Sequence, residues 1–280
     1  MLEKYFLSLT RALLILTLVT SCSRSHARST VQAQSSDSAT VKEEVEIIDP
    51  TVIHRLTDDD YKQAAHELGI DVASIKAVIE IEAGQTHQGF YKPNQPIINF
   101  DLPMFKKWAA RHGIKLGKYS RSNAVVFARP NAKKYGSYQA AQYERLKSAL
   151  SIDSIAAIEG TFWGMFQIGG FNWQKCGTES PVDFARRMST SEKEQLELFV
   201  NFLKSNNLVK YLKAKNWAGF ALRYNGPSYA KRGYHTRLAK AYSKYKKQSK
   251  SNIRCATISS PIRYFVYICD VVKPLISLLQ

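Results

Sequence analysis

Apolar residues recur at helical spacing through most of the chain between residues 50 and 248. From Val72 to about Ala83, for example, Ile75, Val78 and Ile79 fall on one stripe, which is typical of a helix that packs one face against a core. Strands and helices do not alternate, so we predict a mostly α protein with a single helical domain at residues 50–248. The spacing predicts further helices at residues 58–68, 103–112, 138–148, 153–158, 192–203, 208–215, 217–225 and 234–247.

Polar residues mark the starts of several of these helices. Thr57 with Asp60, and Ser191 with Glu194, have the spacing of a capping box, in which each side chain bonds the backbone N–H of the other residue. Residues 85–100 contain two prolines and no helical stripe, and we expect them to be loop-like or extended.

The first 21 residues have the parts of a secretory signal. Lys4 and Arg11 supply positive charge, and residues 12–19 form an apolar run that is too short to span a bilayer as a mature helix. The run ends in the sequence Val-Thr-Ser-Cys, whose last residue is Cys22. An aliphatic residue and two small residues before a cysteine resemble a bacterial lipobox, in which the cysteine receives a lipid. We therefore predict a lipoprotein signal peptide at residues 1–21 and lipidation of Cys22.

This N-terminus predicts the compartment of the protein. The chain is expected to be an exported, membrane-anchored lipoprotein on the periplasmic side of a membrane or at the cell surface. Ordinary cleavage near the same point and an uncleaved anchor are the two alternatives, and both also carry the chain across a membrane. Residues 22–49 are rich in Ser, Thr, Ala, Gln and charged side chains, a composition typical of a flexible tether.

The charge of the chain narrows the choice of partner. Forty Lys and Arg residues against 23 Asp and Glu give a formal net charge of +17, which favours polyanions such as nucleic acid, an anionic membrane face or an acidic cell-wall polymer. Because the N-terminus predicts export, we expect no nucleic-acid partner. The N-terminal lipid would supply the contact with the membrane.

Four cysteines and a distinct C-terminal composition leave two questions open. The cysteines show no CxxC spacing and no nearby histidine array, so no metal site is predicted, and no motif indicates a cofactor. Cys255 and Cys269 could form a disulfide, and unpaired thiols are the alternative. Residues 249–280 form a C-terminal tail of unknown role, because the apolar, β-prone stretch 259–280 fits a strand, a docking segment or an appended tail.

Two glutamates in the helix 72–83 fall on different faces. Glu82 lies four residues after Val78 and three after Ile79, so it shares the apolar stripe. Glu80 lies four residues after Lys76 on the other face, where a solvated ion pair is expected. A carboxyl group on an apolar face loses hydration, and its pKa rises. Glu82 could therefore stay protonated near neutral pH and donate a proton, or it could escape to solvent at the helix end.

Five segments of the chain resemble, in order, one known family. Together they cover about residues 56–246 and resemble the N-acetylmuramidase domain of modular phage endolysins, which belongs to the lysozyme-like superfamily. The five segments are the glutamate-bearing sequence Ile81-Glu82-Ala83-Gly84; Trp163 to Ile168 with Gly170-Phe171-Asn172; Ser191-Glu192 with Gln195-Leu196 and Phe199; Trp217 with Phe220-Ala221 and Tyr224 to Pro227; and Tyr234 with Arg237 to Ala239 and Ala241-Tyr242.

The resemblance implies a helical lysozyme-like domain, expected to be monomeric, that cleaves the β-1,4 bond between N-acetylmuramic acid and N-acetylglucosamine in peptidoglycan glycan strands. It implies that Glu82 is the general acid, while a second carboxylate activates water. Asp101 is the candidate for this second carboxylate and Glu159 is the fallback. The resemblance also implies substrate-binding roles for Gln167, which lies in the Phe-Gln-Ile segment, and for Tyr224 and Asn225, which lie at a helix end before Gly226-Pro227.

The sequence departs from the family pattern at three positions. Ala83 stands where the family has Ser, Asp101 stands for a glutamate, and His235 replaces an aspartate. Two other functions therefore stay open. A lytic transglycosylase would attack the same bond with the muramyl 6-hydroxyl and leave a 1,6-anhydro ring, and a cell-wall-binding lipoprotein would release no product. Chitin, which has the same linkage, is an alternative substrate.

Overall fold

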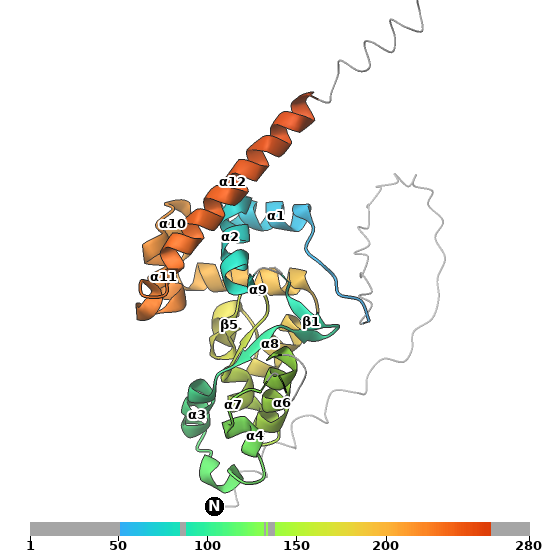
Figure 1. Cartoon of the computed structure of the whole chain (residues 1–280), viewed down its shortest axis with the longest axis vertical. Helices are drawn as coiled ribbons and strands as arrows, with labels where there is room; N and C mark the ends of the chain where they lie inside the picture. Colours follow the sequence, from blue (N-terminus) through green and yellow to red (C-terminus); the bar gives the residue numbers. More distant parts are fainter. Residues whose placement is uncertain (1–50, 85–87, 132, 134–137, 259–280) are drawn as a thin grey trace, which may run out of the picture. The chain divides into compact units, whose positions relative to one another are not determined.

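The computed structural model describes residues 51–84, 88–131, 133 and 138–258, and these form one folded unit. The predicted signal peptide, the tether and Cys22 lie outside the described residues, as do Cys269 and the stretch 259–280. The described part is mostly helical with two small sheets (Figure 1). It confirms the expected mostly α domain.

Two short helices at the N-terminal side carry the glutamate motif. α1 (Asp58–Leu68) begins at a complete capping box, because Thr57 accepts from the backbone of Asp60 while the Asp60 side chain accepts from the backbone of Thr57. α2 (Val72–Glu82) begins at Asp71 and buries Ile75, Val78 and Ile79, as the spacing predicts. Since Glu82 is the last residue of α2, its side chain sits at the edge of the core.

Short strands follow α2 and connect distant parts of the chain. β1 (Phe90–Lys92) and β2 (Gln95–Pro96) form an antiparallel hairpin, so the expected extended conformation is confirmed in this part. A second sheet has the order β3-β4-β5, with bounds β3 (Ile98–Phe100), β4 (Thr161–Trp163) and β5 (Ile168–Gly169). β4 and β5 were not predicted, because three- and two-residue strands are too short to show a period.

Figure 1 shows the strands between two groups of helices. The lower group lies between β3 and β4 in the chain. It contains α3 (Leu102–Arg111), η2 (Leu116–Tyr119), α4 (Ala124–Phe127), α6 (Tyr138–Leu150) and α7 (Ser154–Glu159). After β5 come η3 (Gly170–Cys176), α8 (Pro181–Met188), α9 (Glu192–Ser205), α10 (Val209–Lys213), α11 (Trp217–Asn225), η4 (Pro227–Tyr229) and α12 (Tyr234–Ile258).

The core is aromatic and centres on α9. The ring of Phe199 stacks on that of Phe166 at 4.0 Å between centroids, and both side chains are fully buried. Trp163 is buried as well, so Trp163 and Phe166 are core residues. Cys176 is a buried free thiol, and the side chain of Cys255 is outside the described residues.

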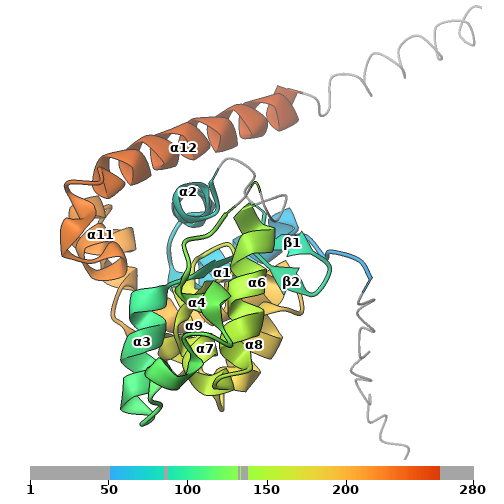
Figure 2. The ribbon, with the colours of Figure 1, turned by 60° about the horizontal axis from the view of Figure 1, so that its bottom comes forward.

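α12 is longer than the sequence predicts. The expected helix ends at Lys247 and the expected domain at residue 248, but α12 continues to Ile258. Figures 1 and 2 show it crossing α2 and continuing beyond it. Asp71 at the start of α2 accepts from Tyr242 at 2.8 Å and pairs with Lys246 at 3.1 Å. These bonds fix α12 on α2. No helix in the described ranges is long and apolar enough to cross a membrane.

Candidate active site

The end of α2 opens into a cleft of about 800 Å³. Its walls come from segments that are far apart in the sequence, namely the start of α3, the turn between β4 and β5, η3, α9 and the junction of α11 with α12. All five residues predicted for the site from sequence, other than Cys22, line this cleft: Glu82, Asp101, Gln167, Tyr224 and Asn225. The lining residues are Ile81, Glu82, Asn99, Asp101, Met104, Phe162, Gln167, Ile168, Gly169, Phe171, Asn172, Phe202, Asn206, Leu208, Arg223, Tyr224, Asn225, Gly226, Arg232 and Tyr234.

Glu82 has the electrostatic character of a proton donor. Desolvation in the cleft raises the pKa of its carboxyl group to about 7, although a hydrogen bond from Asn225 and the field of Arg237 oppose the rise. A carboxyl group with this pKa is partly protonated at neutral pH and can transfer its proton to a leaving group. Glu80 points elsewhere and pairs with Lys244 of α12 at 2.7 Å.

Asn225 holds the carboxyl group of Glu82. Its Nδ2 donates to Glu82 Oε1 at 2.8 Å. Because Oε1 accepts this bond, the proton that Glu82 can donate is left to the other oxygen, Oε2. The sequence predicts that Asn225 binds substrate, whereas the structure gives it a direct contact with Glu82.

Asp101 serves the fold as well as lining the cleft. It is the N-cap of α3, and its Oδ1 accepts from the backbone N of Met104 at 2.8 Å. This hydrogen bond fixes the carboxyl group at the cleft wall. A second carboxylate therefore lines the same cleft as Glu82.

Glu159, the fallback for the second carboxylate, is placed outside the cleft lining. Its side chain is buried, and its Oε2 lies 2.6 Å from Nε2 of His112 at the end of α3. This pairing joins α7 to α3. The sequence could not separate Glu159 from Asp101, because the contact with His112 spans 47 residues.

Gln167 sits in the turn that joins β4 to β5. Its φ of 48° is in the left-handed region, which is uncommon for a residue other than glycine and often marks a functional turn. Its Nε2 donates to the carbonyl of Gly164 at 2.9 Å. This bond uses the amide nitrogen, so Gln167 presents its amide oxygen as the group that can accept from a ligand.

Tyr224 braces the same turn from α11. Its hydroxyl donates to the carbonyl of Phe166 at 2.7 Å, and its ring stacks on Phe220. Burial raises the pKa of the Tyr224 phenol well above its usual value, and the nearby charge of Glu82 adds to this rise. The hydroxyl therefore stays neutral and is already engaged, which makes Tyr224 a positioning residue for the turn.

Two polar side chains of α9 hold the backbone around the site. Glu192 accepts from the backbone N of Gly89 at 2.9 Å and of Leu56 at 3.0 Å, and it pairs with Arg55. Gln195 accepts from the backbone N of Met165 at 2.9 Å and donates to Met188. The Ser-Glu-x-x-Gln pattern therefore ties both the segment after Glu82 and the turn of Gln167 to one rigid helix.

Several cleft residues were missed by the sequence analysis. Asn99 pairs with Phe162 across β3 and β4, which brings both to the cleft wall. Arg223 and Arg232 also line the cleft, although the sequence shows them only as two of 40 basic residues. Their proximity to Asn225 in the chain, two and seven residues away, is the one signal that could have identified them.

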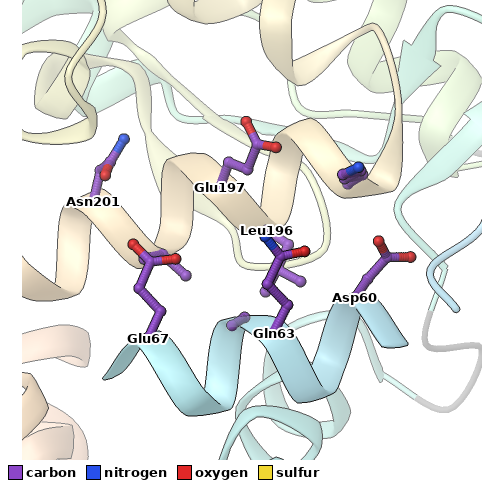
Figure 3. Close-up of a pocket in the computed structure, with 9 residues that line it drawn as sticks. Asp60, Gln63, Glu67, Leu196, Glu197 and Asn201 are labelled. Carbon is purple, nitrogen blue, oxygen red and sulfur yellow. The ribbon is translucent and has the colours of Figure 1, made fainter. Parts of the chain in front are cut away.

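A second, smaller cavity of about 270 Å³ lies between α1 and α9 (Figure 3). Its carboxylates are engaged in structural contacts. Asp60 completes the cap of α1, Glu67 pairs with Lys204, and Glu197 pairs with Arg187 at 3.1 Å. This cavity contains none of the residues predicted for the catalytic site.

The family model for N-acetylmuramidases matches residues 71–246, which is more than half of the chain. The chain belongs to the N-acetylmuramidase family. Its muramidase domain is also similar to the crystal structure of the endolysin of Burkholderia phage AP3, with 33% sequence identity and a TM-score of 0.56. The similarity covers 70% of this chain and 72% of the endolysin. No curated protein matches the chain.

Family membership confirms the expected peptidoglycan hydrolase, a glycoside hydrolase of lysozyme type. It does not favour the lytic transglycosylase or the non-catalytic wall-binding protein. The cleft of the muramidase domain contains a carboxyl group of raised pKa, a second carboxylate, and amide and aromatic side chains.

Proposed function

We propose that Glu82 is the general acid that cleaves the β-1,4 bond between N-acetylmuramic acid and N-acetylglucosamine. The observation that carries this role is the desolvated carboxyl group at the cleft, held by Asn225 through Oε1. Oε2 of Glu82 transfers its proton to the glycosidic oxygen as the bond from the anomeric carbon to that oxygen breaks. Water attacks the oxocarbenium-like centre at the anomeric carbon. One of its hydrogens stays in the new hydroxyl group and the other passes as a proton to a base.

The pH dependence tests this role. We expect kcat/KM on soluble glycan strands to fall about tenfold per pH unit above a midpoint near the Glu82 pKa of about 7, because only protonated Glu82 can act as the acid and kcat/KM reports the free enzyme. The measurement is an initial-rate profile from pH 5 to 9 at constant ionic strength. A midpoint that stayed near the ordinary glutamate pKa, or a rate that rose through pH 7, would contradict the role.

Asp101 is the base in this proposal. It lines the same cleft, and its position is fixed by the backbone of Met104. Gln167 then orients the substrate by accepting from a sugar amide or hydroxyl group through its amide oxygen. Asn225 and Tyr224 act on the protein side of the site, by fixing the acid and the turn.

Two substitutions at Asp101 separate catalysis from helix capping. Asn can also cap a helix, so Asp101→Asn is expected to keep the melting temperature and to lower kcat by about a hundredfold, the lower limit for losing an acid–base group. Asp101→Ala loses both functions and should also cost about 1 kcal/mol of unfolding free energy. Initial rates and thermal melts check both. An active Asp101→Asn enzyme would leave Asp101 with the capping role alone.

We further propose that a lipid on Cys22 anchors the exported muramidase to a membrane, with residues 22–49 as the tether and a monomeric domain acting on the wall. The apolar run at residues 12–19 and the small residues before Cys22 support this. In a bacterial host, the mature N-terminal peptide is expected to begin at acylated Cys22, and Cys22→Ser should abolish the acylation. Mass spectrometry reads this directly, and a mature N-terminus without acyl groups would remove the proposal.

A further inference from the structure

The cleft carries positive charge near the junction of α11 with α12. Arg223 of α11 and Arg232, just before α12, line it, and no other Lys or Arg is among its lining residues. Apart from the carboxylates Glu82 and Asp101, the remaining polar side chains of the lining are neutral amides and two tyrosines. A neutral glycan needs no cation for recognition, so these two arginines indicate an anionic part of the substrate.

We propose that Arg223 and Arg232 bind a carboxylate carried by the lactyl substituent of the muramyl residue, so that the cleft selects anionic strands over neutral ones. This inference rests on the proposed function, because it places a muramyl residue beside Glu82. The carboxylate has two sources. Intact strands carry carboxylates on the stem peptide attached to the lactyl group, and strands without stems carry the free lactyl carboxylate.

The positions of the arginines fit this role. Arg223 lies two residues before Asn225, the last residue of α11, whose Nδ2 donates to Glu82 Oε1 at 2.8 Å. Arg223 therefore lies at the end of α11 that contacts Glu82. Its guanidinium stacks on the ring of Tyr211 at 4.5 Å, and Nη1 contacts the carbonyl of Gly219 at 3.5 Å. These contacts hold the planar group in place. Arginine can bind a carboxylate through two parallel N–H bonds, which a lysine cannot do.

Arg232 completes the pair from the other side of the Gly226 turn. Its side chain is exposed, and it belongs to the segment that leads into α12, whose first residue Tyr234 also lines the cleft. Two guanidinium groups among the lining residues suit a charged substituent that extends from the glycan, while the sugars stay among the amides and aromatic rings. The substituent is bound equally before and during cleavage of the glycosidic bond. Loss of this binding should therefore raise KM and leave kcat nearly unchanged.

The test compares three substrates with the full chain in detergent. They are soluble strands with stem peptides, the same strands with stem carboxyl groups converted to methylamides, and strands whose stems were removed by an amidase. We expect kcat/KM on intact strands to exceed that on amidated strands about tenfold, mostly through KM. In Arg223→Gln/Arg232→Gln this ratio should fall to about one. Lysine at both positions should restore only part of it.

Matched controls and the three substrates decide between outcomes. Lys240→Gln/Lys247→Gln removes the same charge from exposed positions of α12 that do not line the cleft, and it should keep the ratio. If the wild type prefers only the intact strands, the arginines bind the carboxylates of the stem peptide. If it also prefers the stemless strands over the amidated ones, they bind the free lactyl carboxylate. Equal rates of wild type on all three substrates, or a ratio that survives in the folded double variant, would overturn the inference. A wild type that cleaves none of them would instead contradict the proposed function.

Discussion

Replacing Glu82 by glutamine is expected to lower kcat on peptidoglycan by about three orders of magnitude. Glutamine keeps the size of the side chain and can still accept from Asn225, but it has no proton to give to the leaving oxygen. The release of reducing ends from purified peptidoglycan measures the effect. Retention of more than about a tenth of the wild-type rate would contradict the role, because acid catalysis of this bond contributes far more than tenfold.

Glu80→Gln is the matched control for this variant. Glu80 lies two residues away on the same helix but pairs with Lys244 of α12 and does not line the cleft. Its replacement should leave kcat within about twofold, because a carboxyl group outside the cleft cannot transfer a proton to the substrate. An equal loss of activity in both variants would point to damage of α2, not to loss of the acid.

Glu82→Gln should also raise the stability of the fold in alkaline solution. The pKa of Glu82 is raised in the folded state to about 7 from 4.5, so its favourable contribution is complete below pH 4.5 and is lost as pH rises through 7. Above pH 7 the wild type must hold a desolvated charge, whereas Glu82→Gln holds a neutral amide. Thermal melts should therefore coincide near pH 4 and separate in favour of the variant at pH 8.

The largest loss of stability is expected from Glu192→Ala. The change leaves the buried N–H of Gly89 without its acceptor at 2.9 Å and also removes the acceptor of Leu56 N. Each such loss costs about 1–3 kcal/mol, while half-exposed Arg55 returns to water at little cost. We expect the free energy of unfolding to fall by about 3 kcal/mol and the melting temperature by roughly 6–12 °C.

Glu197→Ala provides the comparison on the same helix. Glu197 is half exposed and pairs with Arg187, which also bonds Glu194, so its removal should change the unfolding free energy by no more than about 0.5 kcal/mol. Urea unfolding of the three proteins measures the difference. Similar losses from both substitutions would show that Glu192 does not hold the backbone at Gly89.

The sequence predicted most of the longer helices and the place of Glu82 on α2, because both depend on local spacing, but it did not predict α8. Ile75, Val78 and Ile79 define the buried face of α2, and Glu82 continues that face. Capping at Thr57 and Asp71 fixes where α1 and α2 begin. The resemblance added the order of the motifs, and family membership then established the peptidoglycan hydrolase.

The parts that sequence could not predict depend on contacts between distant segments. The pairing of Glu159 with His112 and the bond from Asn225 to Glu82, which spans 143 residues, have no local signature. Arg223 and Arg232 are ordinary basic residues until the fold places them at the cleft. The continuation of α12 past residue 248 was missed because residues 249–258 include two Ser, one Asn and one Thr, which have low helix propensity, and no helical stripe is evident in their sequence.

Digestion of purified peptidoglycan in heavy-oxygen water tests the central claim most directly. The full chain and Glu82→Gln are compared, and the muropeptides are analysed by mass spectrometry. We predict that the wild type releases reducing N-acetylmuramic acid ends that each carry one heavy oxygen atom from water, and that the variant releases essentially none. Ends with a 1,6-anhydro ring and no heavy oxygen, or no product from a folded chain that still sediments with the wall, would contradict hydrolysis with Glu82 as the acid.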